Sequence, residues 1–150
     1  MIPQYQTITD KGSGNCMAAC LASILEMPLT DVPNFAEHAT AVAYWDAFHD
    51  WLAGHGMVAL RIYLGHMGDE GMIYVEGNIG DQFVILSGRS PRGNNISHAV
   101  VGKLSESGWG WDVVHDPHPS GFGLAGPIEY VNILIRKPII PLELGECYER

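Results

Sequence analysis

The sequence has few basic residues and no long hydrophobic run. Eight Lys and Arg residues stand against 17 Asp and Glu residues, which gives a formal net charge of −9. Surplus negative charge repels phosphate backbones, so this composition argues against nucleic-acid binding. No apolar run approaches the ~18 residues of a membrane span, and the N-terminal MIPQYQTITDKG lacks the basic and apolar regions of a secretory signal. We therefore expect a cytoplasmic protein whose partners are neither nucleic acids nor membranes.

Cysteine is scarce as well. The chain contains three, which are Cys16, Cys20 and Cys147. An odd number at these spacings fits neither a disulfide framework nor a zinc ribbon. The thiols are therefore expected to be free, and one of them is a candidate for a reactive group.

The remaining composition is that of a globular protein. The chain has 150 residues, of which 47% are hydrophobic and 17% are charged. This length suits one hydrophobic core, and neither a repeat nor a linker divides the chain. We expect a single domain over residues 1–150, with a loosely held tail over residues 139–150.

Two helical patterns come first. One is an apolar stripe at the i, i+3, i+4, i+7 spacing, made of Met17, Cys20, Leu21 and Ile24. It predicts a helix over residues 15–26 that Asn15 caps and Pro28 ends. A second amphipathic pattern over residues 41–52 ends at the GHG of residues 54–56.

Short β-like runs bounded by glycine, proline or asparagine follow the helices. They cover residues 57–64, 72–76, 82–87, 98–104, 110–115 and 130–136. Helices followed by a mostly antiparallel sheet of about five or six strands is an α+β arrangement.

Cys16 falls in the first turn of the predicted helix. The unpaired N–H groups and the positive end of the helix dipole there favour a thiolate, which lowers the pKa of a cysteine. The alternative is a small apolar residue, because cysteine is among the most buried residue types. Cys20 lies one turn further on the apolar stripe and is interpreted as a core residue.

A thiolate nucleophile needs a base, and the base needs a third group that orients it. His98 opens one predicted strand, and a hairpin centred on Ser107 places Asp116 directly opposite it, with Cβ atoms ~4.5–5.5 Å apart. A shift of the turn centre by half a residue puts His115 there instead. Because Asp116 precedes a proline, it is also a candidate turn initiator. Four histidines without a carboxylate partner are expected at the surface: His38, His49, His55 and His66.

Two further segments carry polar side chains. The segment HDPH could supply metal ligands from His115, Asp116 and His118, with Cys16 or His98 as a further ligand. Two prolines stiffen this segment, however, and the sequence contains no second close pair of ligands. We therefore expect no metal site. The loop SGRSPRGNN at residues 87–95 lacks the Walker lysine pattern and a following helix. It is interpreted as lining or gating a cleft, or as a simple turn.

The order of these residues along the chain resembles that of papain-like cysteine peptidases, with a cysteine at the first helix tip, a histidine starting a strand and an aspartate ending the next. The segments NCMAACLASIL, SHAVVGKL and VVHDPHPS are most similar to the double-glycine leader peptidases of bacteriocin exporters. They also resemble small uncharacterised bacteriophage proteins of comparable length. The similarity runs from about residue 4 to about residue 120 and is specific only in these three segments.

The resemblance implies a papain-like α+β fold with a catalytic triad. In that triad Cys16 is the nucleophile, His98 is the general base and acid, and Asp116 orients His98. It also implies an upstream glutamine that donates to the oxyanion together with the Cys16 backbone N–H. Gln6 is our choice for this glutamine, with Gln4 as the alternative.

The activity that the resemblance implies is cofactor-independent hydrolysis of a peptide, isopeptide or amide bond through a thioester. The expected partner is a peptide or protein substrate, and for a phage protein this would be a host protein in the host cytoplasm. Two alternatives stay open, because the same triad serves several reactions. One is a transglutaminase-like or deamidating acyl transferase, and the other is a non-catalytic binding protein on a papain-like scaffold.

Overall fold

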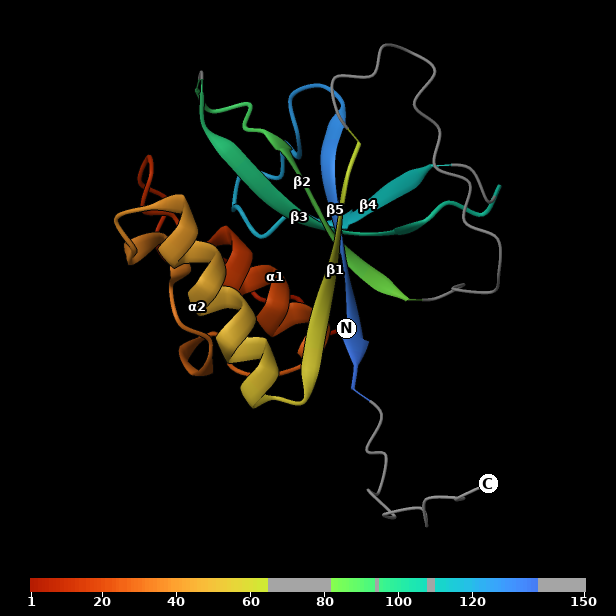
Figure 1. Cartoon of the computed structure of the whole chain (residues 1–150). Coiled ribbons are helices and arrows are strands. Elements are labelled where there is room, and N and C mark those ends of the chain that lie inside the picture. Colours follow the sequence, from red (N-terminus) through yellow and green to blue (C-terminus); the bar gives the residue numbers. More distant parts are fainter. Residues whose placement is uncertain (65–81, 94, 108–109, 138–150) are drawn as a thin grey trace, which may run out of the picture.

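The computed structural model describes residues 1–64, 82–93, 95–107 and 110–137. Over these ranges the chain is α+β, with the α-helices before the strands, as the sequence patterns predict (Figure 1). The elements in chain order are α1 (Cys16–Leu25), η1 (Leu29–Asp31), η2 (Phe35–Glu37), α2 (Ala41–Gly54), β1 (Met57–Tyr63), β2 (Phe83–Arg89), β3 (Ser97–Leu104), β4 (Trp111–His115) and β5 (Ile128–Arg136).

Both predicted helices and five of the six predicted strands are confirmed with small changes at their ends. The strand expected over residues 72–76 and the tail expected from residue 139 lie outside the described residues. Neither α-helix of the described ranges has the length and apolar character needed to span a bilayer.

The strands form one antiparallel sheet in the order β1-β5-β2-β3-β4. Among the described strands, β5 is the last along the chain, yet it lies between the first two, β1 and β2. Both α-helices cover the same face of the sheet (Figure 1), with α1 against β2 and β3 and α2 against β1.

Side-chain alternation along the strands buries both faces of the sheet. The helix-facing side packs against α1, η2 and α2 through Met57, Ile85, Ala99, Val101 and Leu134. The opposite side carries a second apolar cluster of Val84, Leu86, Val100 and Val131. Cys20 is fully buried in the first cluster, which confirms its interpretation as a core residue.

The start of α1 is fixed by Asn15, although not by capping. Its side chain makes no hydrogen bond to the first turn of the helix, so the predicted cap is wrong. Asn15 Oδ1 instead accepts the backbone N–H groups of Thr7 at 3.1 Å and Ile8 at 3.0 Å. The side chain thus holds the preceding segment against the tip of α1.

The first residues of the chain run along α1 in the opposite direction. The Ile2 N–H donates to the Ser23 carbonyl at 3.2 Å, and the Gln4 N–H donates to Ser23 Oγ at 2.8 Å. Because the Asn15 bonds hold the other end, this segment brings Gln6 to the start of the helix. The helix itself ends at Glu26, whose left-handed φ of 56° comes before Pro28.

The hairpin of β3 and β4 forms, but its predicted register is wrong. The turn centre falls after Ser107, and a bulge beside Gly102 adds one residue to β4, so that Val101 pairs with His115. His98 therefore faces neither Asp116 nor His115 across the ladder, and its partner is Gly88 of β2. A side chain at position 102 would overlap Leu86, which explains the glycine at the bulge.

Replacing Asn15 by alanine is expected to destabilise the protein. The substitution leaves the N–H groups of Thr7 and Ile8 without their acceptor, which costs about 1–3 kcal/mol for a buried group. Urea unfolding of Asn15→Ala against the parent protein measures this difference. Thr30→Ala, whose hydrogen bond is exposed, is the control and should change stability by less than about 0.5 kcal/mol. Equal stability of Asn15→Ala and the parent would contradict the role given to Asn15.

Candidate active site

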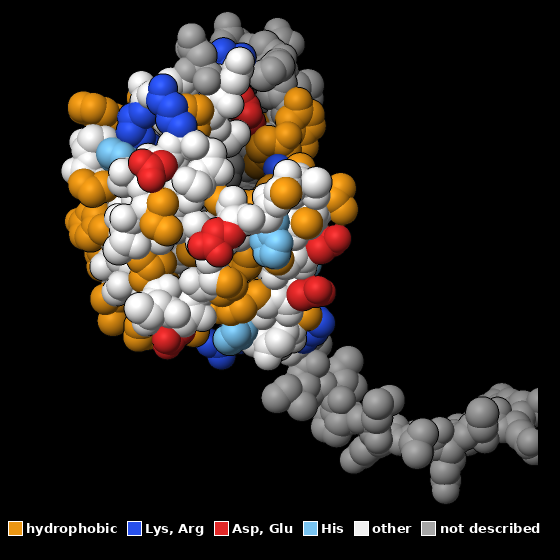
Figure 2. Space-filling view, turned by 90° about the vertical axis from the view of Figure 1, so that its left-hand side faces the viewer, with side chains coloured by type: hydrophobic (Ala, Val, Ile, Leu, Met, Phe, Trp, Pro, Cys, Tyr) orange, Lys and Arg blue, Asp and Glu red, His pale blue; other side chains and the backbone are white. Residues whose placement is uncertain are grey.

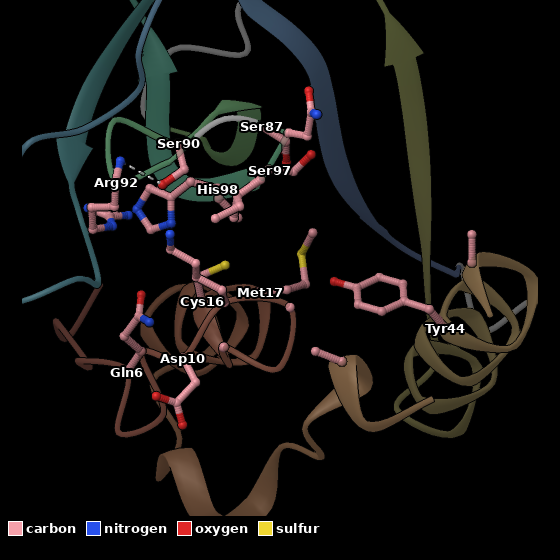
Figure 3. Close-up of a pocket in the computed structure, with 18 of the residues that line it drawn as sticks. Gln6, Asp10, Cys16, Met17, Tyr44, Ser87, Ser90, Arg92, Ser97 and His98 are labelled. Carbon is pink, nitrogen blue, oxygen red and sulfur yellow. Dashed lines mark hydrogen bonds between the residues drawn. The ribbon is translucent and has the colours of Figure 1, made fainter. Parts of the chain in front are cut away.

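A cavity of about 550 Å³ opens where the tip of α1 meets the start of β3. The loop before α1, the N-terminal part of α2, strand β2 and the residue 90–97 loop also contribute to its walls. Figure 2 looks onto the helical side of the molecule, where charged side chains are scattered among apolar ones and the surface is hollowed. Cys16, His98 and Gln6 all line this cavity (Figure 3).

Cys16 is the first residue of α1 and lies at the floor of the cavity. Burial raises the pKa of its thiol, and the backbone N–H groups of Ala99 and Met17 together with the charge of Arg92 offset only part of this effect. The expectation that the helix terminus lowers this pKa below its usual value is therefore wrong. At neutral pH, Cys16 is a protonated thiol.

His98 lies near the start of β3 and is only 3% exposed. Its Nε2 lies 2.7 Å from Asp116 Oδ1. Burial lowers the pKa of His98, and the hydrogen bond to Asp116 opposes that shift without cancelling it. Because an ionised carboxylate can only accept, Nε2 carries the proton and Nδ1 is left with a lone pair. His98 is thus a neutral imidazole whose basic Nδ1 has no hydrogen-bond partner in the described part of the chain.

Asp116 follows β4 and is held by several donors at once. Oδ1 accepts the N–H of His118 at 2.8 Å as well as His98, and Oδ2 accepts the N–H of Gly123 at 2.8 Å. Burial raises the pKa of Asp116, but these hydrogen bonds outweigh it, so the net pKa is lowered. The side chain therefore initiates a turn and orients His98, which joins the two roles considered from the sequence.

Cys16 and His98 lie side by side at one end of the cavity, because the backbone N–H of Ala99, the residue after His98, is near enough to the Cys16 sulfur to lower its pKa. Figure 3 shows His98 above Cys16. The hydrogen bonds of the described residues include none between the sulfur and the imidazole. Such bonds are often long in ligand-free sites and shorten when substrate binds.

Gln6 reaches the cavity and Gln4 does not line it. Gln6 Nε2 donates one proton to the Ile8 carbonyl at 2.8 Å, and its second amide proton remains available. The Gln6 Oε1 atom is buried without a hydrogen-bond partner in the described part of the chain. Of the two glutamines, only Gln6 lies where it could donate to an oxyanion.

Arg92 is a site residue that the sequence did not single out. Its Nη1 lies 4.0 Å from Asp116 Oδ2 and donates to Ser120 Oγ at 3.2 Å. Its charge favours the thiolate form of Cys16. The only sequence signal was the presence of an arginine in the loop before His98. This loop lines the cavity, which agrees with one of the two interpretations given to it from the sequence.

Of the other histidines, His38 and His118 also line the cavity, and His118 lies beside the predicted triad with its ring centre 6.3 Å from that of His98. His115 bonds the Gln4 carbonyl at 2.9 Å and packs edge-on against Tyr5. His38, His49 and His55 are exposed, as predicted, and His66 lies outside the described residues. Within those residues, no group of three His, Cys, Asp or Glu side chains is placed to hold a metal ion.

No protein-family model, curated protein or solved structure matches this chain. Its function therefore has to be argued from the chemistry of the cavity.

The raised pKa of Cys16 predicts slow alkylation at neutral pH. Because burial disfavours the thiolate, the rate of reaction with iodoacetamide should rise with pH and reach half its maximum above the ~8.5 of a free cysteine. Mass spectrometry of the Cys16 peptide after timed labelling measures this profile, with N-acetylcysteine as the reference thiol. A rate that stays high and constant down to neutral pH would show a preformed thiolate and contradict this assignment.

The lowered pKa of Asp116 predicts a pH-dependent contribution to stability. The stabilisation is complete above the unfolded-state pKa of ~3.9 and is lost as the pH falls through the folded-state value. Asp116→Asn should lower the free energy of unfolding at pH 7 by about 1–3 kcal/mol, because the hydrogen bonds lose their charge. In urea unfolding, this difference from the parent should narrow below about pH 4. The exposed Asp112→Asn should show no comparable difference at either pH.

Proposed function

We propose that the protein is a cysteine-dependent hydrolase that cleaves a peptide, isopeptide or other amide bond. Cys16 is the nucleophile, His98 the general base and acid, and Asp116 the orienting carboxylate. The observation that carries this proposal is the 2.7 Å hydrogen bond from His98 to Asp116 beside the cavity that Cys16 lines. A thiol, an imidazole with a free nitrogen and an orienting carboxylate are the parts that nucleophilic catalysis needs.

The arrangement of the elements supports a papain-like scaffold for this chemistry. The cysteine is the first residue of a helix that packs on the sheet, and the histidine lies at the start of a strand beside it. The carboxylate follows the next strand. This order and placement agree with the chain order that the resemblance to papain-like peptidases implies.

The reaction would begin with two neutral groups. As the substrate carbonyl carbon approaches Cys16, the thiol proton moves to Nδ1 of His98 and the sulfur forms a bond to carbon. Asp116 keeps the Nε2 proton in place and stabilises the imidazolium that forms. The carbonyl oxygen becomes an oxyanion, which the Cys16 backbone N–H and the second Gln6 amide proton can bind.

The tetrahedral intermediate then collapses. The C–N bond breaks, the amine leaves with the proton from His98, and the acyl group remains on Cys16 as a thioester. A water molecule that gives its proton to His98 attacks the thioester, and the second collapse releases a carboxylic acid and restores the thiol. The cycle needs no metal or organic cofactor.

The substrate class is a peptide or a protein-linked amide. The cavity extends from Gln6 and Cys16 to Arg61 and Tyr130, which leaves room for groups beyond the cleaved bond itself. The resemblance to phage proteins supports a host protein as the substrate and the host cytoplasm as the location.

Substitution of the proposed triad is the direct test. With fluorogenic peptide amides as substrates, Cys16→Ala and His98→Ala should each lower the hydrolysis rate by at least about 1,000-fold. Gln6→Ala should lower it by about 100-fold, because one oxyanion donor is lost. Cys20→Ala removes the other described thiol, one turn along α1, and should keep the rate within a few-fold of the parent.

The product analysis separates the proposal from its alternatives. Intact-mass detection of an acyl adduct on Cys16, followed by two cleaved fragments, supports hydrolysis. Release of ammonia from a glutamine substrate without chain cleavage would instead show an acyl transferase or deamidase. Full biological effect in Cys16→Ala, with no adduct on the parent protein, would show a binding protein.

A further inference from the structure

The cavity continues away from Cys16 to a second end. There it is lined by Tyr44 of α2, Arg61 of β1, Ser87 of β2 and Tyr130 of β5. We call these four residues, together with the buried Asn132 that pairs with Arg61 in the sheet, the distal subsite. Figure 3 shows Tyr44 and Ser87 on the side of the cavity opposite Gln6, with the Tyr44 hydroxyl pointing into it.

Arg61 is stacked on two aromatic rings, and no described residue pairs with its charge. Its guanidinium carbon lies 3.8 Å from the centre of the Trp45 ring and 3.9 Å from the centre of the Tyr130 ring. Stacking between two rings fixes the plane of the guanidinium and leaves its N–H edge free. No hydrogen bond or ion pair joins Arg61 to any other described residue.

Near Arg61, the buried side chain of Asn132 and the buried Oγ of half-buried Ser87 also lack partners among the described residues. Asn132 is fully buried, and neither its amide nitrogen nor its amide oxygen has a hydrogen-bond partner among the described residues; the same holds for Ser87 Oγ. Asn132 is the direct ladder partner of Arg61, and Ser87 is that of Tyr130. A buried polar group left unpaired costs about 1–3 kcal/mol, so such a cluster is retained at a cost that a ligand would offset.

Tyr44 adds a neutral donor. Burial raises the pKa of its hydroxyl well above the ordinary value, so the hydroxyl keeps its proton. The cavity wall therefore offers an arginine edge and the hydroxyl groups of Tyr44 and Ser87 as hydrogen-bond donors, with the buried Asn132 carboxamide next to Arg61 in the sheet. Glu129 also lies on the cavity wall, but its counterion is Arg89 at 3.7 Å, whereas Arg61 has no counterion among the residues that the structure describes.

We propose that the distal subsite binds a carboxylate of the substrate, so that the enzyme prefers amides that carry an acidic group at a fixed distance from the cleaved bond. A planar arginine edge fits the two oxygens of a carboxylate, and the neighbouring donors satisfy the remaining lone pairs. This inference rests on the proposed function, because it assigns the substrate class of the same cavity.

Covalent labelling of Cys16 tests the subsite without requiring a known substrate. The probes are bromoacetamides with an alkyl spacer that ends in a carboxylate, each matched by one that ends in a carboxamide, in a series of increasing spacer length. At one spacer length the carboxylate probe should label Cys16 about tenfold or more faster than its carboxamide partner. In Arg61→Gln the ratio of the two labelling rates should fall to about one. In Arg61→Lys it should keep only part of its parent value, because lysine lacks the planar edge.

Control variants exclude unspecific charge effects. Arg136→Gln removes an exposed positive charge at the other end of β5 and should leave the ratio unchanged. Asn132→Leu should lower the ratio and raise Tm, because it removes an unpaired buried amide. A ratio near one at every spacer length, or a ratio that survives Arg61→Gln, would overturn the proposal.

The same data distinguish failure of the subsite from failure of the catalytic proposal. Hydrolysis of amides, together with labelling of Cys16 that shows no carboxylate preference, would overturn the subsite alone. A carboxylate preference in a protein that hydrolyses no amide would support the subsite and contradict the hydrolase.

Discussion

The hydrogen bond between His98 and Asp116 is the interaction on which the rest of the site depends. It joins the start of β3 to the turn after β4, beyond the point where their ladder of backbone hydrogen bonds ends. One carboxylate accepts this bond and the N–H groups that shape the following loop, so the turn and the imidazole orientation are set together. The same bond fixes which imidazole nitrogen faces the thiol. Loss of the carboxylate would therefore disturb a loop, a tautomer and a charge at once.

The tip of α1 is organised by a second polar residue with a similar double task. The Asn15 side chain accepts hydrogen bonds from the backbone of Thr7 and Ile8, and this holds the neighbouring Gln6 near Cys16. Nine residues separate Gln6 from Cys16 in the sequence. The loop between Gln6 and Cys16 forms part of the cavity wall. Distance along the sequence is thus a poor guide to whether an upstream glutamine can serve the cysteine.

The sequence was informative wherever the signal was local. Helical and strand periodicities predicted the order of the elements, and the strand-starting His98 and strand-ending Asp116 could be paired from one hairpin. The register of that hairpin could not be predicted, because the bulge lies at Gly102, where a side chain would overlap Leu86 of β2, a strand outside the hairpin. The predicted lowering of the Cys16 pKa was wrong because it considered only the helix terminus, whereas Cys16 packs against the hydrophobic core and its burial raises the pKa. Arg61 gave no signal at all, because its two stacking rings lie 16 and 69 positions away.

The position of β5 inside the sheet has a consequence for how the molecule is made. Every residue of α1, α2 and β1 to β4 leaves the ribosome before residues 128–136, yet β1 and β2 are hydrogen-bonded only through the strand that those residues form. Until then the chain carries two sheet edges that face a missing neighbour. The cavity is also completed by β5, since Tyr130 lines its far end, whereas Cys16 and His98 belong to α1 and β3, which are synthesised earlier. A nascent chain therefore holds its thiol and imidazole before it holds a complete binding site, so substrate recognition matures last.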